Sequence, residues 1–362
     1  MKKHFITWMM IFVFVVFWSC QKDEQPEEEV IPDTGVRFDL DQVPYSSLSY
    51  YRFFNGNLAD FTANSRVLPY APITPLFSDY AHKSRFIWMP AGESATYQGD
   101  GKVFNFPDGT VMIKNFYYDN VQPAGTRKIL ETRLIYKKDG AWHFADYIWN
   151  DEQTEALFSL EGSYVPVEWI DEEGITRNVE FRIPSEAECH TCHKVNDLNM
   201  PIGPKPQNLN SIYDYADGSM NQIEKWLEVG YLSGDIPENI ETTVDWTDTT
   251  QPLEKRVRSY VDMNCAHCHQ EGSHCSYRPM RFAYSESTTE ANMGICVEPQ
   301  EMITPQLTHI IARGNILRSV MHYRMNTTSQ EYRMPLLGRT VVHEEAVALI
   351  EEYINSLSPN CP

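Results

Sequence analysis

Apolar and polar residues alternate along the middle of the chain, in short runs separated by turn residues. The turns are Pro107–Gly109, Lys138–Gly140 and Asp171–Gly174. The predicted strands are residues 103–106, 110–118, 128–136, 142–149, 164–170 and 175–183. Alternation around such turns is typical of β-hairpins. We therefore predict an antiparallel β-rich domain over residues 45–183, in which Pro69–Pro90 is extended and loop structure.

Beyond residue 183 the apolar residues recur every three or four positions, which predicts helices. One helix is expected over residues 220–229, one from Leu253 up to about Val261, and one over residues 342–357. The predicted fold class is α+β, with the N-terminal antiparallel β-rich domain followed by mainly α segments. A linker rich in Pro and Thr is expected at residues 237–252.

Two copies of Cys-x-x-Cys-His occur, at Cys189–His193 and at Cys265–His269. In a helical turn the two cysteines lie on one face, so that both thiols can add to the vinyl groups of one porphyrin. The next histidine then supplies the proximal nitrogen to the iron. We predict two covalently attached haem c groups. The attachment residues are Cys189, Cys192, Cys265 and Cys268, and the proximal ligands are His193 and His269. The alternative for such pairs is structural zinc.

The N-terminus has the pattern of an export signal. A basic start is followed by the apolar run Phe5–Trp18, which is short for a membrane span, and then by Cys20. This resembles a bacterial lipoprotein signal, with residues 1–19 as signal peptide and lipid on Cys20. An acidic tether is expected over residues 20–44. The predicted location is the outer membrane, on the periplasmic or the surface-exposed side; the alternative is an uncleaved single-span anchor.

The net charge limits the class of partner, and the remaining cysteines limit the possible disulfide. The formal net charge is −20, which argues against nucleic acid and favours a redox partner with a basic patch. Cys275, Cys296 and Cys361 are left after the motif cysteines and Cys20 are assigned. We predict a disulfide between Cys275 and Cys296, with Cys361 as the alternative partner of either.

Distal ligands are sought among the methionines, whose sulfur stabilises ferrous iron. Residues 253–362 have the pattern of a class I-like cytochrome c domain, in which a Met-Pro step before the last helix delivers that sulfur. Met334 occupies this place, with Met325 and Met321 as rivals. For the first haem segment, residues 184–236, the candidates are Met220 and Met200.

Four sequence words together carry a family resemblance. They are Pro75-Leu-Phe-Ser-Asp-Tyr80, Pro201-Ile-Gly-Pro-Lys205, Asn264-Cys-Ala-His-Cys-His269 and Met334-Pro-Leu-Leu-Gly-Arg339. Their order resembles the dihaem c-type cytochrome family of bacterial lipoproteins that is often found beside a parallel β-helix repeat protein. The resemblance covers about residues 45–357. It implies haem binding and electron transfer, with no settled reaction.

A second resemblance concerns Pro107–Lys114, which is similar to cytochrome P460-type proteins, where a lysine can cross-link to haem. We expect an exported dihaem electron carrier. The alternative is a haem-dependent oxidoreductase, peroxidase-like or P460-like, in which an open first haem is fed by the second; no catalytic residue is assigned. A third possibility is a haem-bearing binding or structural module.

Overall fold

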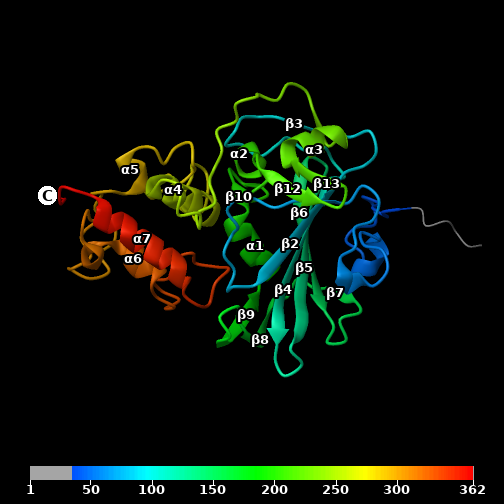
Figure 1. Ribbon diagram of the computed structural model, residues 1–362, viewed down its shortest axis with the longest axis horizontal. Coiled ribbons are helices and arrows are strands. Elements are labelled where there is room, and N and C mark those ends of the chain that lie inside the picture. Colours follow the sequence, from blue (N-terminus) through cyan, green and yellow to red (C-terminus); the bar gives the residue numbers. More distant parts are fainter. Residues whose placement is uncertain (1–34, 362) are drawn as a thin grey trace, which may run out of the picture. The chain divides into compact units, whose positions relative to one another are not determined.

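The computed structural model describes residues 35–361, and its main element is an antiparallel sheet of eight strands (Figure 1). Strands β1, β2, β4, β5, β6 and β7 follow one another across the sheet, and β8 and β9 extend it from β4. Their bounds are β1 Leu68–Pro69, β2 His82–Trp88, β4 Val111–Val121, β5 Thr126–Lys138, β6 Ala141–Trp149, β7 Ala156–Phe158, β8 Ser163–Ile170 and β9 Thr176–Ile183.

The predicted hairpins on either side of Lys138–Gly140 and of Asp171–Gly174 are confirmed as β5–β6 and β8–β9. Two details differ. Residues 103–106 form no strand, and β2 lies within Pro69–Pro90, which was predicted as extended and loop structure without a defined strand. The sequence pattern did not reveal β2, because two positions on one face of the strand carry Lys83 and Arg85 instead of apolar residues.

The two faces of the sheet bury different residues, because side chains alternate along each strand. One face packs against the N-terminal segment, with Phe86, Ile113 and Leu134 in one apolar cluster with Tyr51 and other aromatic side chains. The opposite face carries cross-strand rows that run from β2 to β6. One of these rows is apolar and comprises Ile87, Met112, Ile135 and Phe144.

The packed body begins ahead of residue 45. Phe38 and Val43 belong to the apolar cluster on the first face of the sheet, and the Phe38 ring lies 5.8 Å from that of Trp88. These apolar side chains take residues of the predicted tether into the core. The predicted signal peptide, Cys20 and the rest of the tether lie outside the described residues.

The remaining strands are short. They are β3 Ala95–Thr96, β10 Lys194–Val195, β11 Leu198–Asn199, β12 Ile212–Tyr215, β13 Gly218–Asn221 and β14 Leu232–Ser233. The α-helices are α1 Glu186–Cys192, α2 Pro206–Leu209, α3 Gln222–Glu228, α4 Leu253–Asn264, α5 Glu290–Met293, α6 Val320–Met325 and α7 Glu344–Ser356, and the 3-10 helices are η1 Leu48–Tyr51, η2 Leu58–Asp60 and η3 Ile316–Arg318.

The predicted fold class is wrong in its second part. The antiparallel β-rich domain is present, but the mainly α, cytochrome c-like segments are not, because 19% of the described residues are helical and 26% are in strands. Of the helices in the described part of the chain, α4 and α7 alone exceed seven residues, and turns and loops account for most of residues 265–343. No helix within residues 35–361 has the length and apolarity needed to cross a membrane.

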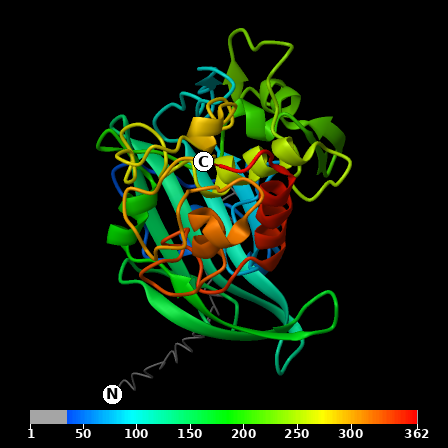
Figure 2. The same cartoon turned by 90° about the vertical axis from the view of Figure 1, so that its left-hand side faces the viewer.

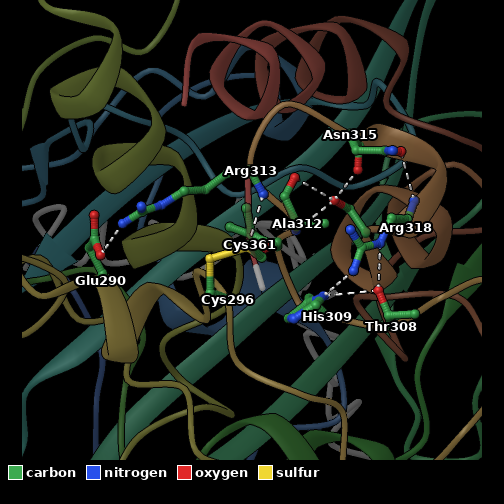
Figure 3. The surroundings of a disulfide bond; sticks show 11 residues. Glu290, Cys296, Thr308, His309, Ala312, Arg313, Asn315, Arg318 and Cys361 are labelled. Carbon is green, nitrogen blue, oxygen red and sulfur yellow. Dashed lines mark hydrogen bonds and ion pairs between the residues drawn. A yellow bond between two sulfur atoms is a disulfide. The ribbon is translucent and has the colours of Figure 1, made fainter. Parts of the chain in front are cut away.

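The C-terminal part is held by helix packing and one disulfide. Helix α7 contacts α4 and α6, and Figure 2 shows α6 and α7 next to each other. Cys296 is bonded to Cys361, so the predicted Cys275–Cys296 bridge is wrong and the alternative with Cys361 is present (Figure 3). The reason is that the chain after α7 returns to the segment around Arg313, whose N–H lies 3.3 Å from Cys361 Sγ. Cys275 is buried and free.

Candidate functional site

The first Cys-x-x-Cys-His motif occupies the end of α1. The helix begins with a capping box, in which the Ser185 N–H donates to Glu188 at 2.8 Å, and this satisfies a backbone donor that would otherwise lack a partner. Cys189 and Cys192 fall three residues apart in the last turn and therefore share a face. His193 is the C-cap residue, and its N–H donates to Cys189 O at 3.0 Å.

His193 has the protonation state that a metal ligand needs. Its Nδ1 atom lies 2.9 Å from Met200 O, and because a carbonyl oxygen only accepts, Nδ1 carries the proton and Nε2 keeps its lone pair. Burial lowers the pKa of His193 to about 4, so the ring is neutral at neutral pH. The ring also packs edge-on against Phe144 of β6, with 5.2 Å between the centroids.

The second motif follows directly on α4. Cys265 caps the helix, and its carbonyl accepts from the N–H groups of Cys268 and His269 at 3.1 and 3.0 Å, which makes the motif one further turn. Asn264, the last residue of α4, accepts from the N–H of Phe77 at 2.8 Å. Burial lowers the pKa of His269 to about 4, and its buried Nδ1 atom has no hydrogen-bond partner among the described residues.

The two motifs meet through their second cysteines. Ligand atoms of Cys192, His267 and Cys268 lie within 4.8 Å of one another. A hydrogen bond with the Cys268 thiol lowers the pKa of Cys192 well below its ordinary value, and the same bond raises the pKa of Cys268. These three groups could hold a metal ion, but structural zinc takes four ligands, and Cys189 and Cys265 are not part of the group.

A cavity of about 280 Å³ adjoins the second motif. Its walls contain both cysteines and the histidine of that motif and all three methionines considered as ligands, namely Cys265, Cys268, His269, Met321, Met325 and Met334. Met321 and Met325 are buried in the apolar core of the C-terminal part, whereas Met334 is outside that core cluster. Met334 is therefore the methionine whose sulfur is least needed for core packing.

The loop that carries Met334 is fixed by backbone hydrogen bonds. The Met334 N–H donates to Arg324 O at 2.9 Å. Arg339, of which 2% is exposed, donates to the carbonyl oxygens of Met334, Val341, Arg324 and Thr327 at 2.9–3.0 Å. One buried guanidinium thus closes the loop, which holds the Met334 backbone at the cavity wall.

A smaller cavity of about 100 Å³ adjoins the first motif and contains Cys189, Cys192 and His193 in its walls. Neither predicted distal methionine of this motif lines it. Met200 supplies the carbonyl that orients His193, and Met220 lies in β13 and packs against the core on the sheet. The structure therefore does not bring these two sulfur atoms to the first cavity.

Asp79, in the first of the family-like sequence words, contacts the residues that directly follow the last word, Met334–Arg339. Asp79, of which 1% is exposed, accepts from the N–H groups of Thr340 and Val341 at 2.6 and 3.1 Å, and from the Thr340 hydroxyl. Pro335 and Leu337 of the Met334 loop line both cavities. The available sequence signal was that Asp79, Pro335 and Leu337 belong to the family-like words. That signal carried no information about which residues are in contact.

Comparison of the chain with protein-family models, with curated proteins and with solved structures gave no match. The assignment of function therefore rests on the residues and geometry of the two motifs.

Proposed function

We propose that this protein is a dihaem c-type cytochrome that carries electrons, with one haem attached at Cys189 and Cys192 and the other at Cys265 and Cys268. The observation that carries the proposal is the meeting of two complete Cys-x-x-Cys-His motifs at Cys192 and Cys268, beside cavities that share walls. When bound, haem iron supplies reversible one-electron chemistry.

The donor set is suited to this group. Each motif offers two thiols and a histidine that burial keeps neutral, and His193 is further oriented by its Nδ1 hydrogen bond. Burial raises the pKa of Cys189 and of Cys265 to about 12, so these thiols keep their protons at neutral pH. Met334 is the proposed sixth ligand at the second site, because a neutral sulfur on an otherwise largely apolar wall favours ferrous iron.

Closeness of the attachment points favours an electron carrier over two independent sites. The second cysteine of each motif lies within 4.8 Å of the other, and His267 and Cys192 belong to the walls of both cavities. Two one-electron centres attached at these positions would be close enough to exchange electrons. A redox partner protein, export and lipid attachment at Cys20 are part of the same proposal.

Haem content is the decisive measurement. The purified protein should retain haem after acid–acetone extraction, and its mass should exceed that of the polypeptide by two haems. The double variant Cys265→Ala/Cys268→Ala should lose one haem, whereas Cys275→Ala, which changes a free cysteine outside the motifs, should keep both. Stoichiometric zinc without haem would overturn the proposal and support the Cys192–His267–Cys268 group as a metal site.

A second candidate function is a redox enzyme whose first haem is open. The specific observation is that no methionine among the described residues lines the cavity at Cys189–His193, while four line the other, namely Met280, Met321, Met325 and Met334. In that case carbon monoxide should bind about half of the haem in the reduced protein, and this half should be lost in His193→Gly. If neither haem bound carbon monoxide, the enzyme proposal would fail and only the electron-carrier proposal would remain.

A further inference from the structure

A row of charged side chains crosses the face of the sheet that bears the first cavity. Arg85 of β2 lies opposite Lys114 of β4, Lys114 opposite Arg133 of β5, and Arg133 opposite Asp146 of β6. Residues that are directly opposite each other in adjacent strands point to the same face. Three cations therefore stand side by side on neighbouring strands.

A fourth cation joins the row at the ring of Phe116. Lys83 Nζ lies 6.0 Å from the ring centroid, Lys114 Nζ lies 4.7 Å from it, and Arg133 Cζ lies 4.4 Å from it. The four cations are called the cation cluster below: Lys83, Arg85, Lys114 and Arg133. Cation–π contact with one ring offsets only about 0.5–2 kcal/mol per cation, so Phe116 does not neutralise the cluster.

Carboxylates of the chain compensate only part of this charge. Glu131, which is 0% exposed, pairs with Arg133, and the Nε–Oε2 distance is 2.9 Å. Asp146 Oδ2 is buried, lies 3.9 Å from Arg133 Nε and has no hydrogen-bond partner among the described residues. Burial, together with the nearby Glu131 charge, raises the pKa of Asp146 well above its ordinary value, which favours its neutral form. Glu131 is then the main charge partner, and it serves Arg133.

The other three cations have no carboxylate in hydrogen-bond distance among residues 35–361. Lys83 donates to Ala81 O at 2.7 Å, and the side chains of Arg85 and Lys114 make no hydrogen bond or ion pair with a described residue. Asp79 is near enough to raise the pKa of Lys83, but its oxygen atoms accept from residues 340 and 341. Like charges directly opposite each other in adjacent strands destabilise a sheet. Burial of a charge that has no partner destabilises the folded state further.

The cluster borders the first motif. Arg133 and Asp146 line the same cavity as Cys189 and His193, and the charge of Lys114 contributes to the lowered pKa of His193. The whole chain has a formal net charge of −20, so this is a local excess of positive charge in an acidic protein. Arg133 is the member of the cluster that lines the cavity, and a concentration of cations next to such an arginine is an arrangement that binds anions.

We propose that Lys83, Arg85, Lys114 and Arg133 form a binding site for a carboxylate or a small planar oxyanion beside the first Cys-x-x-Cys-His motif. Arginine supplies paired N–H donors that match the two oxygens of such a group, and the lysines add point charges. Two sources have this chemistry: the propionates of the first haem and a free anion such as formate or nitrite. The first source rests on the proposed function, and the second does not.

The test uses the full chain, after its haem content has been counted, and begins with calorimetric titration of formate and nitrite at pH 6.5. A free anion should bind wild type once per chain, and Arg85→Gln and Lys114→Met should each weaken binding about tenfold or more. Arg127→Gln is the matched control, because Arg127 also lies over a ring, that of Tyr117, but is paired with Asp119.

The propionate source gives a different result. Added anions should then not bind, and one haem potential should fall in Arg85→Gln and in Lys114→Met, because loss of a cation near a carboxylate stabilises ferric iron; Arg127→Gln should leave both potentials unchanged. Lys114→Arg keeps the charge and should retain the wild-type result from either source. Absence of anion binding together with unchanged potentials in folded variants would overturn the site.

Failure of the cation cluster and failure of the proposed function remain distinguishable. A preparation that contains no haem would refute the dihaem proposal, yet calorimetry with formate and nitrite would still report on the cluster. Should both neutral variants fail to fold, the wild-type titration decides for a free anion, and absence of binding would overturn that source. Lys83→Met then decides for the propionates, and unchanged haem potentials in this variant would overturn that source.

Discussion

Replacement of Arg339 by glutamine should release the loop that holds Met334. The guanidinium is 2% exposed and donates to four carbonyl oxygens from three parts of the chain around the second cavity. Glutamine has two N–H donors on one atom and cannot reach all four acceptors. Several buried carbonyl groups would then lose their partner, and their ends of the loop would separate.

The magnitude follows from those four bonds. A hydrogen bond to a charged group contributes about 1.5–3 kcal/mol, but bonds that share one group do not add fully, and water can reach some released carbonyls. We expect Arg339→Gln to lower the free energy of unfolding by about 3–5 kcal/mol, which is about 10 °C in Tm. The free energy of unfolding of Arg339→Lys should lie between those of wild type and Arg339→Gln, since lysine keeps the charge but lacks the planar arrangement of N–H donors.

Thermal unfolding and near-infrared absorption test this together. Arg333→Gln is the control, because the Arg333 side chain lies in the same loop and makes a single hydrogen bond to the described residues, at 3.4 Å to Leu336 O; the Tm of this variant should change little. In Arg339→Gln the sulfur–iron band expected from Met334 should weaken or vanish even at temperatures where the protein is folded. If Arg339→Gln unfolds within about 2 °C of wild type and keeps the band, the loop is not held by this residue.

Three further outcomes are expected. Cys296→Ser should lower the free energy of unfolding by about 4 kcal/mol, because the bond between Cys296 and Cys361 closes a loop with a sequence separation of 65. Chemical unfolding of oxidised and reduced wild type checks this, and equal midpoints would contradict it. Met334→Ala should abolish the sulfur–iron band and lower one redox potential, whereas survival of the band in this variant and its loss in Met325→Ala would identify the other sulfur. Burial and the Arg85 charge lower the pKa of Lys83 to about 7, so its protonated form disfavours folding below pH 7, and this cost disappears as pH rises toward 10. Lys83→Met should therefore raise the free energy of unfolding by about 1–3 kcal/mol over wild type at pH 6.5 in anion-free buffer, and should not change it at pH 10. A difference in Tm that does not depend on pH would refute this.

The sequence predicts the parts of the fold that depend on neighbouring residues. The hairpin at Lys138–Gly140 follows from alternation on both sides of a turn, and α4 and α7 follow from apolar residues at helical spacing. The mainly α second half was a wrong extension of these two helices. Most of residues 265–343 instead form turns, which are stabilised by contacts between distant segments and have no period to detect.

Contacts within the site were beyond the sequence for a related reason. Spacing identifies Cys189, Cys192, Cys265 and Cys268 as motif cysteines, but nothing local indicates that Cys192 and Cys268 face each other. The sequence could not predict the cation cluster for two reasons. Lys83 and Arg85 break the apolar alternation of β2, and their neighbours in the cluster lie on other strands.

The Met334 loop connects what the sequence presents as separate domains. Pro335 and Leu337 line both cavities, so a shift of this loop changes the surroundings of both motifs at once. Asp79, from the β-rich part, holds the same loop at Thr340 through buried hydrogen bonds, which cost more to break than exposed ones. The β-rich domain is therefore part of the site: it forms a wall of the first cavity and, through Asp79, fixes the loop that also closes the second.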